Sequence, residues 1–129
     1  NAVGDIRCFG GKIWKIALQN PRDKNDFITV LKISDKAVTT SGDYERYFFL
    51  DKTKISHIIN PLSGYSADES ISSTIIADNA AAADALATAT YVLGPKDGVK
   101  LVQLYKVAEC LIIDKEKNIY KTPGFASYE

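Results

Sequence analysis

Methionine is absent from the 129 residues, which also hold only one tryptophan, one histidine and two cysteines. Because a translated chain begins with methionine, we expect these residues to be the C-terminal part of a longer protein, with any targeting segment upstream of them. The two cysteines, Cys8 and Cys110, form neither a CxxC nor a metal-ligand pattern. Two buried thiols in strands are therefore expected in preference to a disulfide.

An excess of one charge is absent as well, because 16 Lys and Arg balance 16 Asp and Glu. The sequence therefore argues against a protein that bulk charge holds on nucleic acid or on a membrane surface. No apolar run approaches the length of a membrane span, and the longest, Ala80–Leu93, is interrupted by Asp84. The remaining composition, 46% hydrophobic and 25% charged, is typical of one soluble globular domain with a real core.

Apolar and polar residues alternate in a series of short segments, and this pattern predicts β-strands. The predicted strands cover Asn1–Phe9, Lys12–Leu18, Phe27–Ile33, Lys36–Thr40, Tyr44–Leu50, Ile55–Ile59, Ser70–Ala77, Val107–Ile113 and Ile119–Lys121. Gly10-Gly11 predicts a hairpin turn between the first two strands. The tail, residues 122–129, is assigned to no helix or strand.

Two consecutive helices are predicted between the last strands. Asp78 or Asn79 can cap a helix that ends at Gly94-Pro95, because glycine terminates helices and proline cannot continue them. Pro95 is then well placed at the start of a second helix, Lys96–Tyr105. The predicted fold class is α+β, with antiparallel β-hairpins packed against these two helices.

The only histidine, His57, lies in the stretch 56–64, where Ile58-Ile59 is followed by Asn60-Pro61 and Gly64. Proline fixes φ and glycine permits positive φ, so this order predicts a strand that ends in a sharp turn. A histidine there would be presented at the rim of the sheet and could act as a base near neutral pH. The alternative is an ordinary surface or core histidine.

Asp84 and Thr88 are four residues apart on the first predicted helix and therefore lie on one face of it, one turn apart. Their oxygens are hard ligands suited to Mg²⁺, which commonly keeps further positions for phosphate and water. Alternatively, Thr88 bonds a carbonyl of its own helix and Asp84 is a solvated acid near the helix start.

The polar stretch 39–43 is interpreted as a turn, in which Thr40, Ser41 and Gly42 offer hydroxyls and free amides to an anion. An ordinary hairpin connection is the alternative. The aromatic side chains that follow could stack on a ring or belong to the core or sheet surface. They are Tyr44, Tyr47, Phe48 and Phe49.

At these stretches the sequence resembles the ApbE family of FAD:protein FMN transferases. The matching motifs follow in family order: Asn1-Ala2-x-Gly4-Asp5-Ile6-Arg7 with Gly10, Trp14-x-Ile16, Thr40-Ser41-Gly42-Asp43-Tyr44-Glu45-Arg46-Tyr47, His57-Ile58-Ile59-Asn60-Pro61-x-Ser63-Gly64-Tyr65, and Ala83-Asp84-Ala85-Leu86-Ala87-Thr88-Ala89 with Leu93-Gly94. The resemblance covers essentially the whole chain. It implies that residues 1–129 are the C-terminal portion of a single T-fold-like catalytic domain whose N-terminal half is absent.

The resemblance also implies a Mg²⁺-dependent enzyme that transfers FMN from FAD to a threonine of an acceptor protein, with AMP leaving. Asp84 and Thr88 match the family's helical metal ligands, and His57 matches its active-site histidine, a candidate base. Thr40, Ser41, Gly42 and the main chain around Ile58 would belong to the FAD-binding surface. We expect the fragment alone to be inactive and to need a second chain or self-association. By resemblance, the protein belongs in the bacterial periplasm or on the outer face of the cytoplasmic membrane.

Some positions depart from the family pattern. Asn60 and Ser63 stand where Asp and Thr are usual, and both can make the same turn hydrogen bonds. Ala87 stands where some relatives carry a second Asp just before the metal-binding Thr. Two other functions stay open: an FAD pyrophosphatase that yields FMN and AMP, and a flavin-binding module without catalysis.

Overall fold

The structure, a computed structural model, describes residues 4–129. In chain order its elements are β1 (Asp5–Arg7), β2 (Trp14–Asn20), β3 (Asp23–Ile33), β4 (Ala37–Gly42), β5 (Tyr47–Leu50), β6 (Thr53–Ser56), β7 (Ser70–Ala77), α1 (Ala80–Leu104), β8 (Ala108–Asp114), β9 (Ile119–Lys121) and the 3₁₀ helix η1 (Pro123–Tyr128). The predicted strand over residues 1–9 falls partly outside the described residues. No helix in the described part of the chain has the length and apolar character that a membrane span requires.

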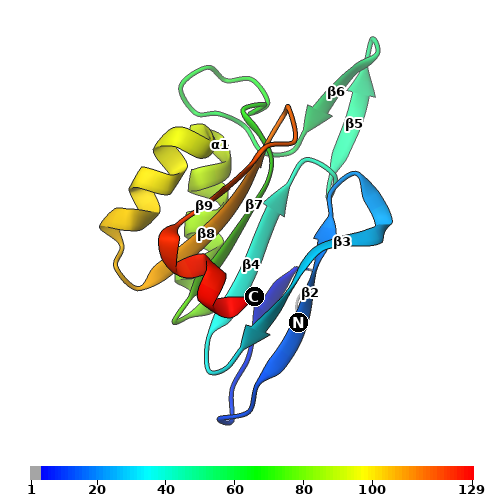
Figure 1. Ribbon diagram of the computed structural model, residues 1–129. Helices are drawn as coiled ribbons and strands as arrows, with labels where there is room; N and C mark the ends of the chain where they lie inside the picture. The colour runs from blue at the N-terminus through cyan, green and yellow to red at the C-terminus, as the bar shows by residue number, and fades with distance from the viewer. Residues whose placement is uncertain (1–3) are drawn as a thin grey trace.

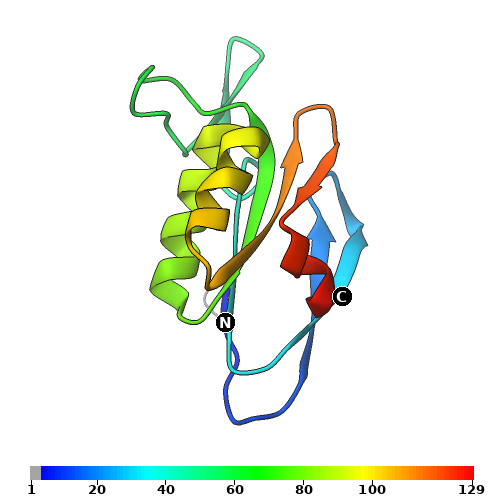
Figure 2. The same cartoon turned by 60° about the vertical axis from the view of Figure 1, so that its left-hand side comes forward.

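A five-stranded antiparallel sheet with the order β1-β4-β7-β8-β9 is the centre of the fold. Helix α1 covers one face, and the β2–β3 hairpin and η1 lie on the other side (Figures 1 and 2). The β5–β6 hairpin is a separate ribbon that projects beyond the sheet (Figure 1). The structure confirms the predicted α+β class.

The core has two layers because neighbouring residues of a strand point to opposite faces of the sheet. In β7, Ile75 packs with Leu86 and Ala87 of α1, whereas Ile76 packs with Leu31 of β3 on the other face. Since both faces are covered, every residue of β7 is buried. Strand β4 and helix α1, which contain the site residues, both pack against β7, so this burial holds them in place.

The two predicted helices are present and meet at a kink within α1. Asn79 caps the first, with its side chain accepting from the amide of Ala82 at 2.8 Å. Gly94 has a φ of 76°, outside the helical region, and Pro95 begins the second half. A Cβ at Gly94 would also lie 3.0 Å from the Cβ of Glu69, so glycine is required there on two grounds.

Two predictions about the chain path are wrong. Gly10 and Gly11 do turn the chain with positive φ, but they do not form a hairpin. Strand β1 pairs with β4, and β2 crosses to the other side of the sheet to pair with β3. The tail is also ordered as η1, because burial of Phe125 in the core holds it against β8. Both differences depend on contacts between distant segments. As predicted, both cysteines are buried and free, but only Cys110 lies in a strand, because Cys8 follows the end of β1.

Two buried threonines on neighbouring strands allow a matched stability test. The Thr39 hydroxyl has no hydrogen-bond partner within residues 4–129, whereas the Thr74 hydroxyl lies 2.8 Å from that of Thr40. Thr39→Val should raise the free energy of unfolding by up to about 1 kcal/mol, because an unsatisfied buried hydroxyl is removed at constant shape. Thr74→Val should lower it by about 1 kcal/mol. Urea denaturation measures both, and equal losses would contradict the assignment.

Candidate active site

The predicted site residues converge on one hollow of about 580 Å³. It lies where the end of β4, the segment after β6 and the first half of α1 meet. All seven predicted residues line it: Thr40, Ser41, Gly42, His57, Ile58, Asp84 and Thr88. The structure therefore brings together side chains that are up to 48 positions apart in the sequence.

His57 follows directly after the last residue of β6, as the strand-end prediction requires. Its main-chain amide donates to the carbonyl oxygen of Arg46 at 3.1 Å, and its ring Nδ1 lies 3.0 Å from the same oxygen. A carbonyl oxygen only accepts, so Nδ1 carries the proton and donates it. In the neutral ring Nε2 is then unprotonated. Because the side chain is exposed, Nε2 can accept a proton from a molecule in the hollow.

The turn after His57 forms as the sequence predicts. The Asn60 side chain accepts from the amide of Leu62 at 2.9 Å, and the amide of Gly64 donates to the Asn60 carbonyl at 2.8 Å. Gly64 has a φ of 73°, which favours glycine. Asn60 thus makes a turn hydrogen bond that an aspartate could also make, and the turn returns the chain so that Ala67 donates to the carbonyl of Ile58 at 2.9 Å.

Asp84 and Thr88 lie one turn apart on α1 and are both exposed in the hollow. Thr88 does not bond its own helix. Its hydroxyl lies 3.2 Å from that of Ser41 on β4. By contrast, the buried Thr90 donates back to the carbonyl of Leu86 at 2.6 Å. None of the ion pairs among the described residues uses the Asp84 carboxylate.

The pair fits a hard cation such as Mg²⁺ as a partial ligand set, because both donors are oxygens and face the same hollow. Within residues 4–129, no group of three or more His, Cys, Asp or Glu is arranged to hold a metal. The remaining positions would have to be filled by substrate phosphate, water or other parts of the protein. Two protein oxygens with phosphate are an ordinary way to hold Mg²⁺.

The predicted anion-binding turn is wrong in its geometry. Thr40, Ser41 and Gly42 are the last residues of β4 and pair with Thr74, Ser73 and Ser72 of β7. The turn begins only at Asp43. Hydroxyls on both strands allow this pairing to continue, since Thr40 and Thr74 contact each other. The three residues still line the hollow, but from a strand end.

Gly42 is required by the aromatic ring that covers it. A Cβ at this position would lie 2.5 Å from the Tyr44 ring. Burial raises the pKa of Tyr44 to about 12, so its hydroxyl stays neutral at physiological pH. The other aromatic side chains of this stretch lie on the exposed β5–β6 ribbon and outside the hollow: Tyr47, Phe48 and Phe49.

Four lining residues were not predicted as site residues: Asp5, Glu45, Arg46 and Ile59. Asp5 reaches the hollow from β1, which pairs with β4 next to the site. Glu45 and Arg46 belong to the turn after β4, and Arg46 orients His57 through its carbonyl. Because every residue has a main-chain carbonyl, a contact of this kind cannot be predicted from the residue type. The only available signal was that all four belong to the matched motifs.

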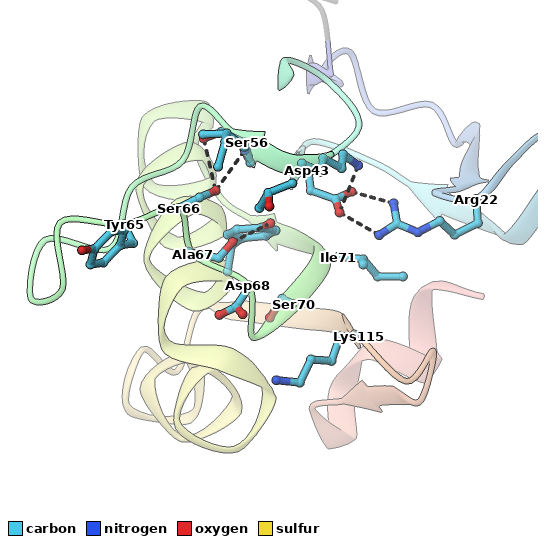
Figure 3. Close-up of a pocket in the computed structure, with 14 residues that line it drawn as sticks. Arg22, Asp43, Ser56, Tyr65, Ser66, Ala67, Asp68, Ser70, Ile71 and Lys115 are labelled. Atoms are coloured by element: carbon cyan, nitrogen blue, oxygen red, sulfur yellow. Dashed lines mark hydrogen bonds and ion pairs between the residues drawn. The ribbon is translucent and has the colours of Figure 1, made fainter. Parts of the chain in front are cut away.

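A second hollow of about 420 Å³ is lined by Arg22, Asp43 and residues of the segments 53–56 and 65–71, among others. Figure 3 shows Arg22 directed at Asp43, with Ser56 and Ser66 on the segments beside them. None of the predicted site residues lines it. The first hollow, which holds the base and the oxygen pair, is therefore the candidate active site.

The sequence model of the ApbE family matches residues 1–112. This chain belongs to the ApbE family. The FAD:protein FMN transferase of Escherichia coli K12 is 36% identical to it over 123 residues, which are 92% of this chain and 35% of that protein. The FAD:protein FMN transferase of Treponema pallidum is 32% identical over 125 residues, 94% of this chain and 34% of that protein. The chain thus spans about a third of the length of these curated relatives.

Solved ApbE structures share the fold. The ApbE protein of Thermotoga maritima superposes with a TM-score of 0.90 at 38% identity, covering 100% of this chain and 43% of that one. The flavin transferase ApbE of Vibrio cholerae gives a TM-score of 0.76 at 27% identity, covering 98% and 42%. The ApbE resemblance and its fold class are therefore confirmed.

Proposed function

We propose that this chain is the C-terminal part of an FAD:protein FMN transferase and that the hollow around His57 is its transfer site. In the reaction, a threonine hydroxyl oxygen of an acceptor protein attacks the FMN phosphorus of FAD. The bond from that phosphorus to the bridging oxygen breaks, and AMP leaves with this oxygen. The hydroxyl proton passes to His57 Nε2.

The observation that carries the proposal is the convergence of His57, Asp84 and Thr88 on one hollow. A base with an open Nε2 faces the same space as two hard oxygens from a helix face. Phosphoryl transfer depends mainly on alignment and on neutralising charge, and less on covalent help. The three residues provide a proton acceptor and a place for a cation next to one substrate volume.

Asp84 and Thr88 are the residues that would hold Mg²⁺. When bound, Mg²⁺ supplies charge neutralisation and alignment of the pyrophosphate. Thr88 is held toward the hollow by Ser41, and Asp84 has no competing ion pair among the described residues. Ala87 provides no additional carboxylate, so this helix offers one charge to the cation.

The rest of the FAD site is proposed to come from parts of the ApbE domain outside these 129 residues, since the relatives are about three times longer. Two protein oxygens also leave the ligand set of the cation incomplete. The isolated chain is therefore expected to show no measurable FMN transfer, and efficient transfer by it would contradict this expectation.

FAD pyrophosphatase activity is the second candidate, because an exposed Nε2 can accept a proton from water as well as from threonine. Incubation of the longer protein with FAD and Mg²⁺, with and without an acceptor protein, separates the two. Transfer yields a fluorescent acceptor band and AMP, whereas hydrolysis yields free FMN and AMP. FAD binding without release of AMP in either reaction would contradict both and favour a flavin-binding module.

A further inference from the structure

We infer that Asp43, held by Arg22 and Lys54, is a positioning residue that fixes the orientation of His57. The kinetic part of this inference rests on the proposed function, whereas its structural part does not. None of these three residues lies among the predicted site residues, and all three line the second hollow.

Asp43 is the centre of a compact ion cluster. Its two carboxylate oxygens accept hydrogen bonds from Arg22 Nη1 at 2.6 Å and Nη2 at 2.7 Å. Lys54 Nζ lies 3.2 Å from one of the same oxygens. The Asp43 side chain is only 14% exposed, so solvent screens the cluster less than an ordinary surface pair. The hydrogen bonds to Asp43 raise the pKa of Arg22. Figure 3 shows the fork of two bonds between the two side chains.

The cluster joins three segments that are distant in sequence. Arg22 belongs to the turn between β2 and β3, Asp43 follows β4, and Lys54 lies in β6 three residues before His57. Removing one cation leaves the carboxylate paired with the other. Removing the carboxylate leaves two cations close together. It also removes the ion contacts that join the three segments.

The segment from Asp43 to Arg46 transmits this position to His57. It is fixed at its start by the Asp43 amide, which donates to the carbonyl of Ile71 at 3.2 Å. In its middle the half-buried Tyr44 ring covers Gly42. At its end the Arg46 carbonyl accepts from both the amide and Nδ1 of His57. Displacing Asp43 therefore displaces the acceptor that selects the protonated ring nitrogen.

The position of the Arg46 carbonyl determines which tautomer the neutral His57 ring adopts. With the Arg46 carbonyl in place, the neutral ring carries its proton on Nδ1 and leaves Nε2 free to accept one. Without that acceptor the ring can rotate and place the proton on Nε2. A ring in that state cannot act as a base toward the hollow. Asp43 does not touch the substrate in this account and acts only through the position of Arg46.

The tautomer can be measured without catalysis by ¹⁵N NMR of histidine-labelled protein at alkaline pH, in the longer protein that contains this chain. The His57 signals are assigned by their loss in His57→Gln. We expect the Nδ1–H form in the wild type and a shift toward the Nε2–H form in Asp43→Asn. Asp43→Glu, which keeps the charge, should restore most of the wild-type tautomer. The matched control is Asp78→Asn, which removes the Lys36–Asp78 pair at the start of α1.

Kinetics give the second measurement. Asp43→Asn should lower kcat for FMN transfer by about tenfold or more, because the general base is misoriented, while KM for FAD changes by less than about threefold. Asp78→Asn should change neither. If Asp43→Asn does not fold, the same tautomer and kcat measurements are made on Arg22→Gln. This variant keeps the carboxylate paired with Lys54 and removes only the two hydrogen bonds from Arg22. An unchanged tautomer in the folded variant, or equal effects of Asp43→Asn and Asp78→Asn on kcat, would overturn the inference. If the wild type transfers no FMN while Asp43→Asn still shifts the tautomer of His57, only the proposed function is refuted.

Discussion

Asp84→Ala in the longer protein should abolish Mg²⁺-dependent cleavage of FAD, with a loss of at least about 10²-fold in rate. The reason is that a methyl group cannot hold a hard cation, and the hydroxyl of Thr88 alone provides no charge to bind it. Asp84 is exposed and takes part in none of the ion pairs of the described residues, so its removal should leave the fold intact. Release of AMP, measured across a Mg²⁺ titration, gives the result.

The matched control is Asp97→Ala, on the second half of the same helix and outside the hollow. Asp97 is exposed and pairs only with Lys100, so this variant should retain the activity and Mg²⁺ dependence of the wild type. Wild-type activity of Asp84→Ala at saturating FAD would remove Asp84 from the site. Equal losses in the two variants would point to a general effect on the helix.

His57→Asn should slow FMN transfer by about 10²–10⁴-fold while leaving FAD binding largely intact. The asparagine amide can still donate to the Arg46 carbonyl, but it cannot accept a proton as Nε2 does. Because a base acts in the transition state, kcat should fall and KM should change little. Single-turnover transfer to the acceptor measures the rate, and flavin fluorescence measures the binding.

The result that would contradict this role is a normal transfer rate with weakened FAD binding, which would make His57 a binding residue. The turn variant Asn60→Asp is a useful companion, since it restores the residue usual in the family and keeps the turn hydrogen bond to Leu62. It should leave both the rate and the binding within a few-fold of the wild type.

Local signals in the sequence were enough to predict much of the fold. The cap at Asn79, the break at Gly94-Pro95 and the turn at Gly64 depend on residues only a few positions apart, and all three are present. The pairing of β2 depends instead on how the β2–β3 hairpin packs on the main sheet. No residue near Gly10-Gly11 shows whether β2 pairs with β1 or passes to the other side of the sheet. The prediction failed at that point.

For the site, too, some residues could be predicted from the sequence and others could not. Residue chemistry and spacing singled out His57, Asp84 and Thr88, and the resemblance to the ApbE family assigned them to one site. The structure places them around one hollow. The role of Arg46 could not be predicted, because it acts through a carbonyl that any residue would provide. The cluster of Arg22 and Asp43 joins residues 21 positions apart through a fold that the sequence pattern did not reveal.

The most direct test of the account is the intact mass of an acceptor protein after incubation with the longer protein, FAD and Mg²⁺. The account predicts that the acceptor gains one FMN in phosphoester linkage to a threonine, that one AMP appears for each acceptor modified, and that both are lost in Asp84→Ala. An unmodified acceptor, with FMN and AMP released in equal amounts, would contradict it and show that the site hydrolyses FAD.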